Sequence, residues 1–307
     1  MSRRALALFV AMSALWGLPY LLIKVAVAEL EPSLLVFVRL AMAAAVLAPI
    51  AMAAHAFRGV TRRWRRLAVI AVVGIVLPFL LIAYGEQHIT SSLAALLIAS
   101  DPLFIVVLAL PFDASERPSG ARLIGLILGL VGVAVLFGLD VGGDALGVLG
   151  GAMVLGAAVC YAISALLVKT LSDVPRLGSV TVTLGMAAVV LAPVALLNPP
   201  SHAPGPAAIA SLLTLGLVCT ALAYVLYYAL IAEAGATRAS IITYVNPAVA
   251  VLLGVLVLGE PLTTGTLAGF GLILLGCALA TGVLFAPRRL ARARRIQGAE
   301  LAKGDVS

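Results

Sequence analysis

A few polar residues lie inside long apolar stretches of this sequence, and their types could do chemistry. Asp101 lies near the middle of the apolar stretch 91–110, directly before Pro102. An ionised carboxylate in hydrocarbon costs about 3 kcal/mol on insertion scales, so its retention predicts a functional role or a local partner. Proline removes a backbone donor and frees a carbonyl one turn earlier. The pair therefore predicts either a broken helix at a binding site or a kink whose polar neighbour bonds the freed carbonyl.

A second polar residue precedes a proline in the later part of the chain. Asn246 and Pro247 lie in the apolar stretch 238–258, at a depth that matches Asp101 and Pro102. Interrupted helices at corresponding positions of two halves are typical of a binding site at the membrane midplane. The kinked-helix alternative applies here as well.

Arg39 is a third candidate, in the apolar stretch 33–54. Its counterpart in the second half of the chain is Thr183, so the repeat does not require a charge at this position. This difference indicates a role for Arg39 that only the first half performs. The guanidinium could pair with one of three acidic residues or bind a substrate carboxylate in bidentate fashion. Those three acidic residues are Glu29, Glu31 and Asp101.

Aromatic residues are scarce, yet all seven tyrosines fall in apolar stretches. Trp16 and Tyr161 occupy equivalent positions in the two halves, and Tyr20 follows Trp16 on the same helical face at i+4. A stacking or cation–π surface for a small organic substrate is one interpretation, and core packing is the other. The candidates for such a surface are Trp16, Tyr20, Tyr161, Tyr224 and Tyr244.

Three further polar residues lie at or near the ends of apolar stretches. Lys24 lies within one turn of the end of the first apolar stretch, where a long lysine commonly extends its amine to the interface. Glu86 and His88 lie in a turn between apolar stretches and could take part in proton coupling. A solvated loop is the favoured interpretation for this turn.

The composition places these residues in lipid. The 307 residues are 63% hydrophobic and only 11% charged, which leaves too little polar surface for a water-soluble globule. Stretches long enough to cross about 30 Å of hydrocarbon predict ten membrane-spanning helices. They cover about 5–27, 33–54, 67–84, 91–110, 121–138, 146–168, 177–197, 207–231, 238–258 and 265–285.

The chain repeats itself at an offset of 144 residues. Leu40 to Pro49 and Leu184 to Pro193 share eight of ten residues, and Glu116 recurs as Glu260. Each copy holds five predicted spans, an odd number, so the second copy crosses the bilayer in the opposite sense. We expect an all-α polytopic membrane protein of two inverted five-helix repeats, 1–143 and 144–286, followed by a basic tail, 287–307.

The net charge of +7 is a topology signal, because 18 of the 20 basic residues fall on one face of the predicted bundle. The positive-inside rule then predicts that both termini of this multi-pass protein are cytoplasmic. The tail is interpreted as a solvated anchor near lipid, and no nucleic-acid binding is expected.

Several function classes are disfavoured. No HExxH, GxSxG or nucleotide-binding loop is present, so neither an intramembrane enzyme nor an ATP-driven pump is expected. The three cysteines lie within spans at no ligand spacing, which predicts no metal site, and no cofactor is expected. A monomeric secondary transporter is favoured. An uncoupled facilitator of the same solutes is the alternative.

The pattern resembles the drug/metabolite transporter superfamily, specifically its EamA-type ten-helix exporters. The most specific segments are SSLAALLIASDPLF, from Ser91, and TRASIITYVNPAVAVLLGVLVLGEPLTTGTLAGFGLILLG, from Thr237. The resemblance implies a basket of helices around a central cavity, and export of amino acids, metabolites or drugs, often with proton exchange. It places Trp16, Asp101, Tyr161, Tyr244 and Asn246 on cavity-side helices. Asp101 departs from the small or apolar residue that usually precedes this proline, so no relative's substrate preference is transferred; organic cations remain an alternative substrate class.

Overall fold

The computed structural model describes residues 2–111, 120–140, 144–171, 173–200 and 202–281, and its regular elements there are all helical. The first half contains α1 (Arg3–Ala26), α2 (Pro32–Ala53), α3 (Trp64–Ala71), α4 (Leu77–Gly85), α5 (Ser91–Ile98), α6 (Asp101–Ala109) and α7 (Ala121–Asp140). The second half contains α8 (Ala145–Val168), α9 (Arg176–Leu197), α10 (Pro206–Leu213), α11 (Ala223–Ala234), α12 (Ala236–Ala239), α13 (Ile242–Leu258) and α14 (Thr264–Ala280). Glu116 lies outside the described residues.

Two π-helical segments lie at equivalent positions of the two halves. Val72–Val76 joins α3 to α4, and Thr214–Leu222 joins α10 to α11. At the repeat offset of 144 residues the first segment maps onto residues 216–220, inside the second. π-Helical turns are rare and frequently mark functional sites, so each half carries the same local irregularity in its third apolar stretch.

The helices suit a lipid surrounding. Eight helical stretches in the described residues are long and apolar enough to cross a membrane: α1, α2, α7, α8 and α9, and the joined pairs α3–α4, α5–α6 and α10–α11. α13 and α14 are shorter apolar helices. Large apolar side chains such as Val189, Leu197 and Leu256 are exposed on the outside of the bundle. Because such a surface cannot be hydrated cheaply, the chain is a polytopic membrane protein.

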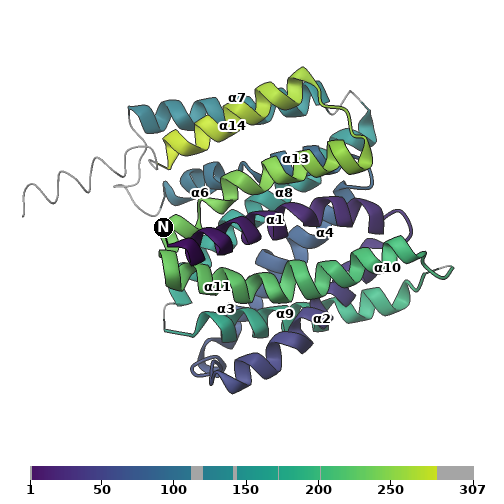
Figure 1. The fold of residues 1–307 in the computed structure, drawn as a ribbon, viewed down its shortest axis with the longest axis vertical. Helices are drawn as coiled ribbons and strands as arrows, with labels where there is room; N and C mark the ends of the chain where they lie inside the picture. Colours follow the sequence, from purple (N-terminus) through teal and green to yellow (C-terminus); the bar gives the residue numbers. More distant parts are fainter. Residues whose placement is uncertain (1, 112–119, 141–143, 172, 201, 282–307) are drawn as a thin grey trace, which may run out of the picture.

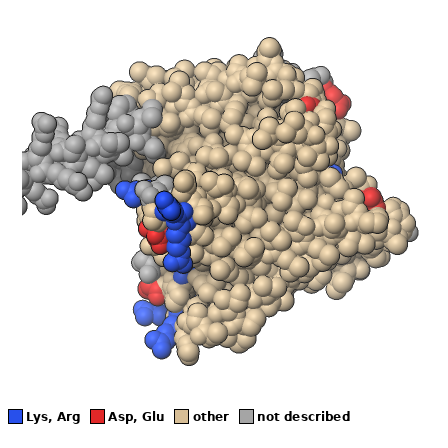
Figure 2. Space-filling view, in the orientation of Figure 1, with Lys and Arg blue, Asp and Glu red and all other residues tan. Residues whose placement is uncertain are grey.

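The helices lie side by side with their axes in one common direction (Figure 1). Lys and Arg gather at the end where α1 begins, with a few acidic residues among them, whereas the opposite end shows mainly acidic residues (Figure 2). We call these the basic end and the acidic end. The basic end carries Arg3, Arg63 and Arg176, and the acidic end carries Glu29, Glu31, Glu86, Asp144 and Glu260.

The packing pairs helices from the two halves. α7 lies along α14 at one edge of the molecule, α2 along α9 at the other, and α1 and α8 contact α13 and α4 between them (Figure 1). Buried aliphatic residues from α2, α9 and the neighbouring helices form the largest core cluster, which includes Leu40, Leu47 and Leu184. Tyr20, Tyr161 and Tyr224 pack against this core.

Glycines set the distance between α7 and α14. A Cβ at Gly276 would lie 2.7 Å from the Gly125 carbonyl oxygen, and one at Gly125 would lie 2.8 Å from the Gly276 carbonyl oxygen. Backbone atoms cannot move aside as a flexible side chain can, so this contact requires the small residues that membrane helices use for close approach.

Gly276→Ala is therefore expected to lower the free energy of unfolding in detergent by about 1–3 kcal/mol, through overpacking. The matched control is Gly271→Ala on the same helix, where a Cβ meets nothing within 4 Å. That control is expected to leave stability equal or slightly higher, because alanine favours helix over glycine. Equal thermal melting of the two variants would contradict the close contact.

Candidate functional site

Arg39 lies buried in the middle of α2, with 8% of its surface exposed. Its Nε donates to the Thr220 hydroxyl at 3.0 Å, and its guanidinium carbon lies 4.3 Å from the centre of the Phe79 ring. Thr220 belongs to the second π-helical segment, where its hydroxyl also donates to the Leu215 carbonyl at 2.7 Å. The widened helical turn thus presents a hydroxyl oxygen to the arginine.

No carboxylate in the described residues forms an ion pair with Arg39. Glu29 accepts from the Gly205 backbone at 2.5 Å, and Glu31 accepts from the Ser33 backbone at 2.7 Å and from the Tyr84 hydroxyl. Among the described residues the ion pair formed is Arg63 with Asp173, at the basic end. The three acidic partners considered from the sequence therefore do not bind Arg39. A buried guanidinium without a counter-ion is costly, which indicates a site that an anionic group completes.

Tyrosine side chains surround this arginine. Tyr20, Tyr161 and Tyr224 come from α1, α8 and α11 and lie within electrostatic range of Arg39. Trp16 packs on this group, with its ring centre 6.1 Å from that of Tyr224 and 4.7 Å from that of Tyr227. Five of the residues proposed from the sequence are thus brought together: Trp16, Tyr20, Arg39, Tyr161 and Tyr224.

A cavity of about 590 Å³ leads from the basic end toward these tyrosines. Its lining includes Lys169 and Arg176 from the basic end, together with Thr183 and Tyr224. Arg39 does not line this cavity, but Tyr224 connects the two because it faces the cavity and lies near Arg39. Thr183 entered the sequence analysis only as the counterpart of Arg39.

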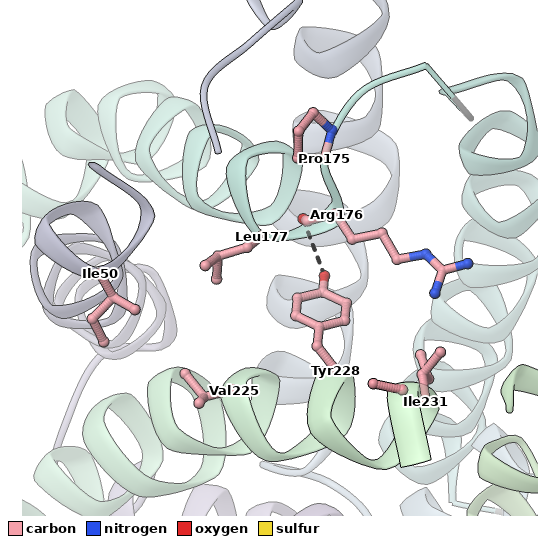
Figure 3. Close-up of a pocket in the computed structure, with 8 residues that line it drawn as sticks. Ile50, Pro175, Arg176, Leu177, Val225, Tyr228 and Ile231 are labelled. Carbon is pink, nitrogen blue, oxygen red and sulfur yellow. Dashed lines mark hydrogen bonds between the residues drawn. The ribbon is translucent and has the colours of Figure 1, made fainter. Parts of the chain in front are cut away.

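A second pocket, of about 420 Å³, adjoins the first between α2, α9 and α11. The two pockets share Arg176, Tyr228 and Ile231. Figure 3 shows the Tyr228 ring standing between these helices with its hydroxyl directed at the Arg176 carbonyl oxygen, to which it donates at 3.3 Å. The Arg176 side chain points away from Ile50 in the same view. Tyr228 therefore stands at the boundary between the two pockets.

The helix break expected at Pro102 lies just before it. α5 ends at Ile98 and α6 begins at Asp101, with Pro102 as its second residue. One Asp101 oxygen is buried without a hydrogen-bond partner among the described residues. Asp101 lies within electrostatic range of Tyr20 and Tyr161, but it forms no ion pair with Arg39.

The corresponding residues of the second half lie elsewhere. α13 runs through Pro247, and the helix break lies earlier, between α12 and α13. With its nitrogen turned toward the preceding turn, the Asn246 amide donates to the Ile242 carbonyl at 2.9 Å and to the Ser13 carbonyl at 3.3 Å. The Tyr244 hydroxyl lies 3.1 Å from the Thr281 hydroxyl. Both side chains join helices to one another rather than approach Arg39.

Two interpretations of the acidic end are corrected by the structure. Glu86 is completely buried and is not part of a solvated loop, although His88 in the same turn is exposed. Lys24 does not extend to the interface, because its Nζ donates to the carbonyls of Glu86 at 2.6 Å and Ile89 at 2.8 Å. The turn after α4 folds over the end of α1, which a one-dimensional pattern does not reveal.

Glu260 holds two distant segments together, a role that its position in the sequence did not indicate. Its carboxylate accepts from the Ser91 and Ser92 backbone nitrogens at 2.7 and 2.9 Å, and from the Ser92 hydroxyl at 2.5 Å. It thereby caps α5 from the connection between α13 and α14. Its recurrence as Glu116 was the available signal, but a repeated glutamate does not say which helix it caps.

Comparison with known proteins identifies the family. The model of the EamA-like transporter family matches residues 3–138 and again 148–282. The chain belongs to the EamA-like transporter family. The two matches show that this EamA protein contains the family unit twice. The family and the relatives below are transporters and not enzymes.

Curated relatives cover most of this EamA protein. An uncharacterized transporter of Archaeoglobus fulgidus is 28% identical over 85% of this chain and 92% of its own length. The uncharacterized transporter YvbV of Bacillus subtilis is also 28% identical, over 86% and 87% of the two chains. A solved crystal structure that is 22% identical matches with a TM-score of 0.65 over 93% of this chain and 98% of that one. This last likeness establishes the fold.

Proposed function

We propose that this EamA protein is a secondary transporter that exports small amphipathic solutes carrying a carboxylate, of which amino acids and related metabolites are the nearest class. The observation that carries the proposal is the buried Arg39 guanidinium, which has no acidic partner among the described residues. A planar fork of N–H donors matches a carboxylate, and the tyrosines and Trp16 beside it offer an apolar surface to the rest of the solute.

The proposed topology has ten spans in two inverted halves, 1–143 and 144–286, with both termini and the tail 287–307 in the cytoplasm of a bacterium. The gathering of arginines at the basic end supports this orientation in the inner membrane (Figure 2). α13 and α14, although shorter than the other spans, complete the second half in this arrangement.

The mechanism follows from which end of the bundle is open. The cavity is lined by Lys169 and Arg176 from the basic end, and we infer that it opens there. At the acidic end Lys24 binds the turn that contains Glu86, and Glu260 binds Ser91, the first residue of α5. With the basic end in the cytoplasm, this is the conformation in which an exporter loads its substrate. Rearrangement of the two halves around Arg39 would then open the acidic end, as alternating access requires.

Counterflow in proteoliposomes tests the substrate class. Liposomes loaded with an unlabelled amino acid are expected to accumulate the labelled one, with no response to labelled organic cations. The basic residues that line the cavity, Lys169 and Arg176, disfavour cations, although the neighbouring tyrosines could bind them by cation–π contact. Accumulation of cationic dyes with none of amino acids would overturn the proposal. Equal flux with and without an imposed pH gradient would indicate a facilitator of the same solutes.

Asp101 is the group that we propose for proton coupling within the central site. Asp101→Asn keeps the size of the side chain but cannot exchange a proton, so the variant is expected to fold and to lose the stimulation of flux by an imposed pH gradient. Flux at equal pH on both sides serves as its control and is expected to persist. Unchanged stimulation would remove Asp101 from the mechanism.

A further inference from the structure

Three segments that are distant in the sequence meet at the acidic end. Lys24 of α1 donates to the carbonyls of Glu86 and Ile89, in the turn between α4 and α5. Glu260, from the connection between α13 and α14, accepts from the first residues of α5. These contacts hold α1, the α4–α5 turn and the α13–α14 connection together. Opening the acidic end requires at least one of them to separate.

Glu86 lies inside this junction. It is a buried carboxyl group that has no role in the transport mechanism proposed above. Its side chain is 0% exposed, and neither carboxylate oxygen has a hydrogen-bond partner among the described residues. The Lys24 ammonium lies close by but is committed to the two backbone carbonyls. A carboxyl group in this setting has lost its hydration without gaining donors in exchange.

The charged and titratable neighbours of Glu86 come from every side. Lys24 and Tyr20 of α1, Arg39 of α2, and Glu260 lie within electrostatic range. α8, which packs against the turn through Gly150, contains no charged residue. Burial raises the pKa of the Glu86 carboxyl well above its ordinary value, Lys24 lowers it, Glu260 raises it, and Arg39 lowers it, in that order of size. The neutral form is therefore the one that this closed junction holds.

We propose that Glu86 is a proton-binding site that controls closure of the acidic end. The junction closes over the neutral carboxyl, and it opens when water reaches the group and the proton leaves. The ligand is a single proton, and the inference rests on the alternating access of the proposed function. It differs from the role proposed for Asp101, because Glu86 sets which end is open and does not contact the substrate.

The direction of the pH dependence follows from the proton count. Between the ordinary pKa of a glutamate and its raised pKa in the closed form, the closed form holds one more proton than the open form. Within that window the ratio of closed to open molecules is expected to fall by about tenfold per unit rise in pH. Below the window both forms are protonated and the closed form keeps its full advantage.

Cysteine accessibility measures this ratio without any substrate. The reporter is Ile89→Cys, a position that is 6% exposed in the closed junction, in a chain whose Cys160, Cys219 and Cys277 are replaced by serine. The purified protein is labelled in detergent with a maleimide, so both ends meet the same pH. Rates are divided by those of Gln87→Cys, an exposed position in the same turn, which removes the pH dependence of the thiol itself.

The normalised rate is expected to rise as pH is raised from 5 to 8. Glu86→Gln, which mimics the neutral form, is expected to give a slow and flat profile. Glu31→Gln is the matched control: Glu31 lies at the same end, but hydrogen bonds from Ser33, Tyr84 and Leu34 outweigh its burial and lower its pKa. It is expected to keep the wild-type profile.

Two results would overturn the inference: a flat profile in the parent protein, or a Glu86→Gln profile that still rises with pH. If Glu86→Gln does not fold, Glu86→Asp takes its place, and it must keep the slope with a shifted midpoint. A flat Glu86→Asp profile counts against the inference. The labelling experiment contains no substrate, so its result does not depend on amino-acid counterflow. The proposed substrate class and the proposed role of Glu86 can therefore be contradicted independently.

Discussion

Replacing Arg39 by glutamine is expected to weaken the apparent affinity for carboxylate-bearing solutes by about 100-fold, equivalent to about 3 kcal/mol. The guanidinium is buried and has no acidic partner among the described residues, so the bound carboxylate would provide its counter-charge. Without it, the carboxylate would enter the site unpaired. Arg39→Lys keeps the charge but not the planar fork, and an intermediate loss is expected. Concentration-dependent counterflow measures both variants.

Two comparisons separate substrate binding from a structural role of Arg39. Thr220→Val removes the hydroxyl that accepts from Nε but leaves the charge, so a loss of about 1 kcal/mol is expected. Competition by an amine analogue that lacks the carboxylate is expected to be the same in the parent protein and Arg39→Gln. The contrary result is that Arg39→Gln loses affinity for the amino acid and the amine analogue equally while its melting temperature stays that of the parent protein. That result would show that Arg39 does not bind the substrate carboxylate.

Most of the helical architecture could be predicted, because lipid imposes length and hydropathy on each span. The repeat at Leu40 and Leu184 marks α2 and α9, which begin 144 residues apart, as corresponding helices, but it did not predict that they contact each other in the structure. The π-helical segments could not be predicted. A π turn differs from an α turn by one residue of hydrogen-bond register, and no pattern of apolar residues records that difference.

The candidate site was predictable where a charged residue interrupts an otherwise apolar stretch. Arg39 and Asp101 were found because a charge inside an apolar stretch is costly wherever it lies. Glu86 and Lys24 were misinterpreted because they lie near the ends of their stretches, where exposure is the usual state. The burial of Glu86 and the hydrogen bonds of Lys24 depend on contacts between α1, the α4–α5 turn and the α13–α14 connection, and only the folded chain supplies those contacts.

The largest loss of stability is expected for Glu260→Gln. The carboxylate accepts two backbone N–H groups at the start of α5 and the Ser92 hydroxyl, all in a buried position. Hydrogen bonds to a charged group contribute about 1.5–3 kcal/mol each, and a buried donor left without an acceptor costs a similar amount. The glutamine amide keeps one oxygen but turns an NH₂ group toward other donors. We expect the free energy of unfolding in detergent to fall by about 3–5 kcal/mol.

The chain supplies a control that removes an acidic cap at the same end of the bundle. Asp144 caps α8 through a longer contact, 3.4 Å to the Gly147 nitrogen, and the residue is exposed. Asp144→Asn keeps a side-chain oxygen and is expected to cost well under about 1 kcal/mol. Thermal unfolding of both variants in one detergent compares a cap between distant segments with a local one. Equal melting temperatures would mean that Glu260 contributes only local capping. The contact of Glu260 with α5 would then not stabilise the junction around Glu86.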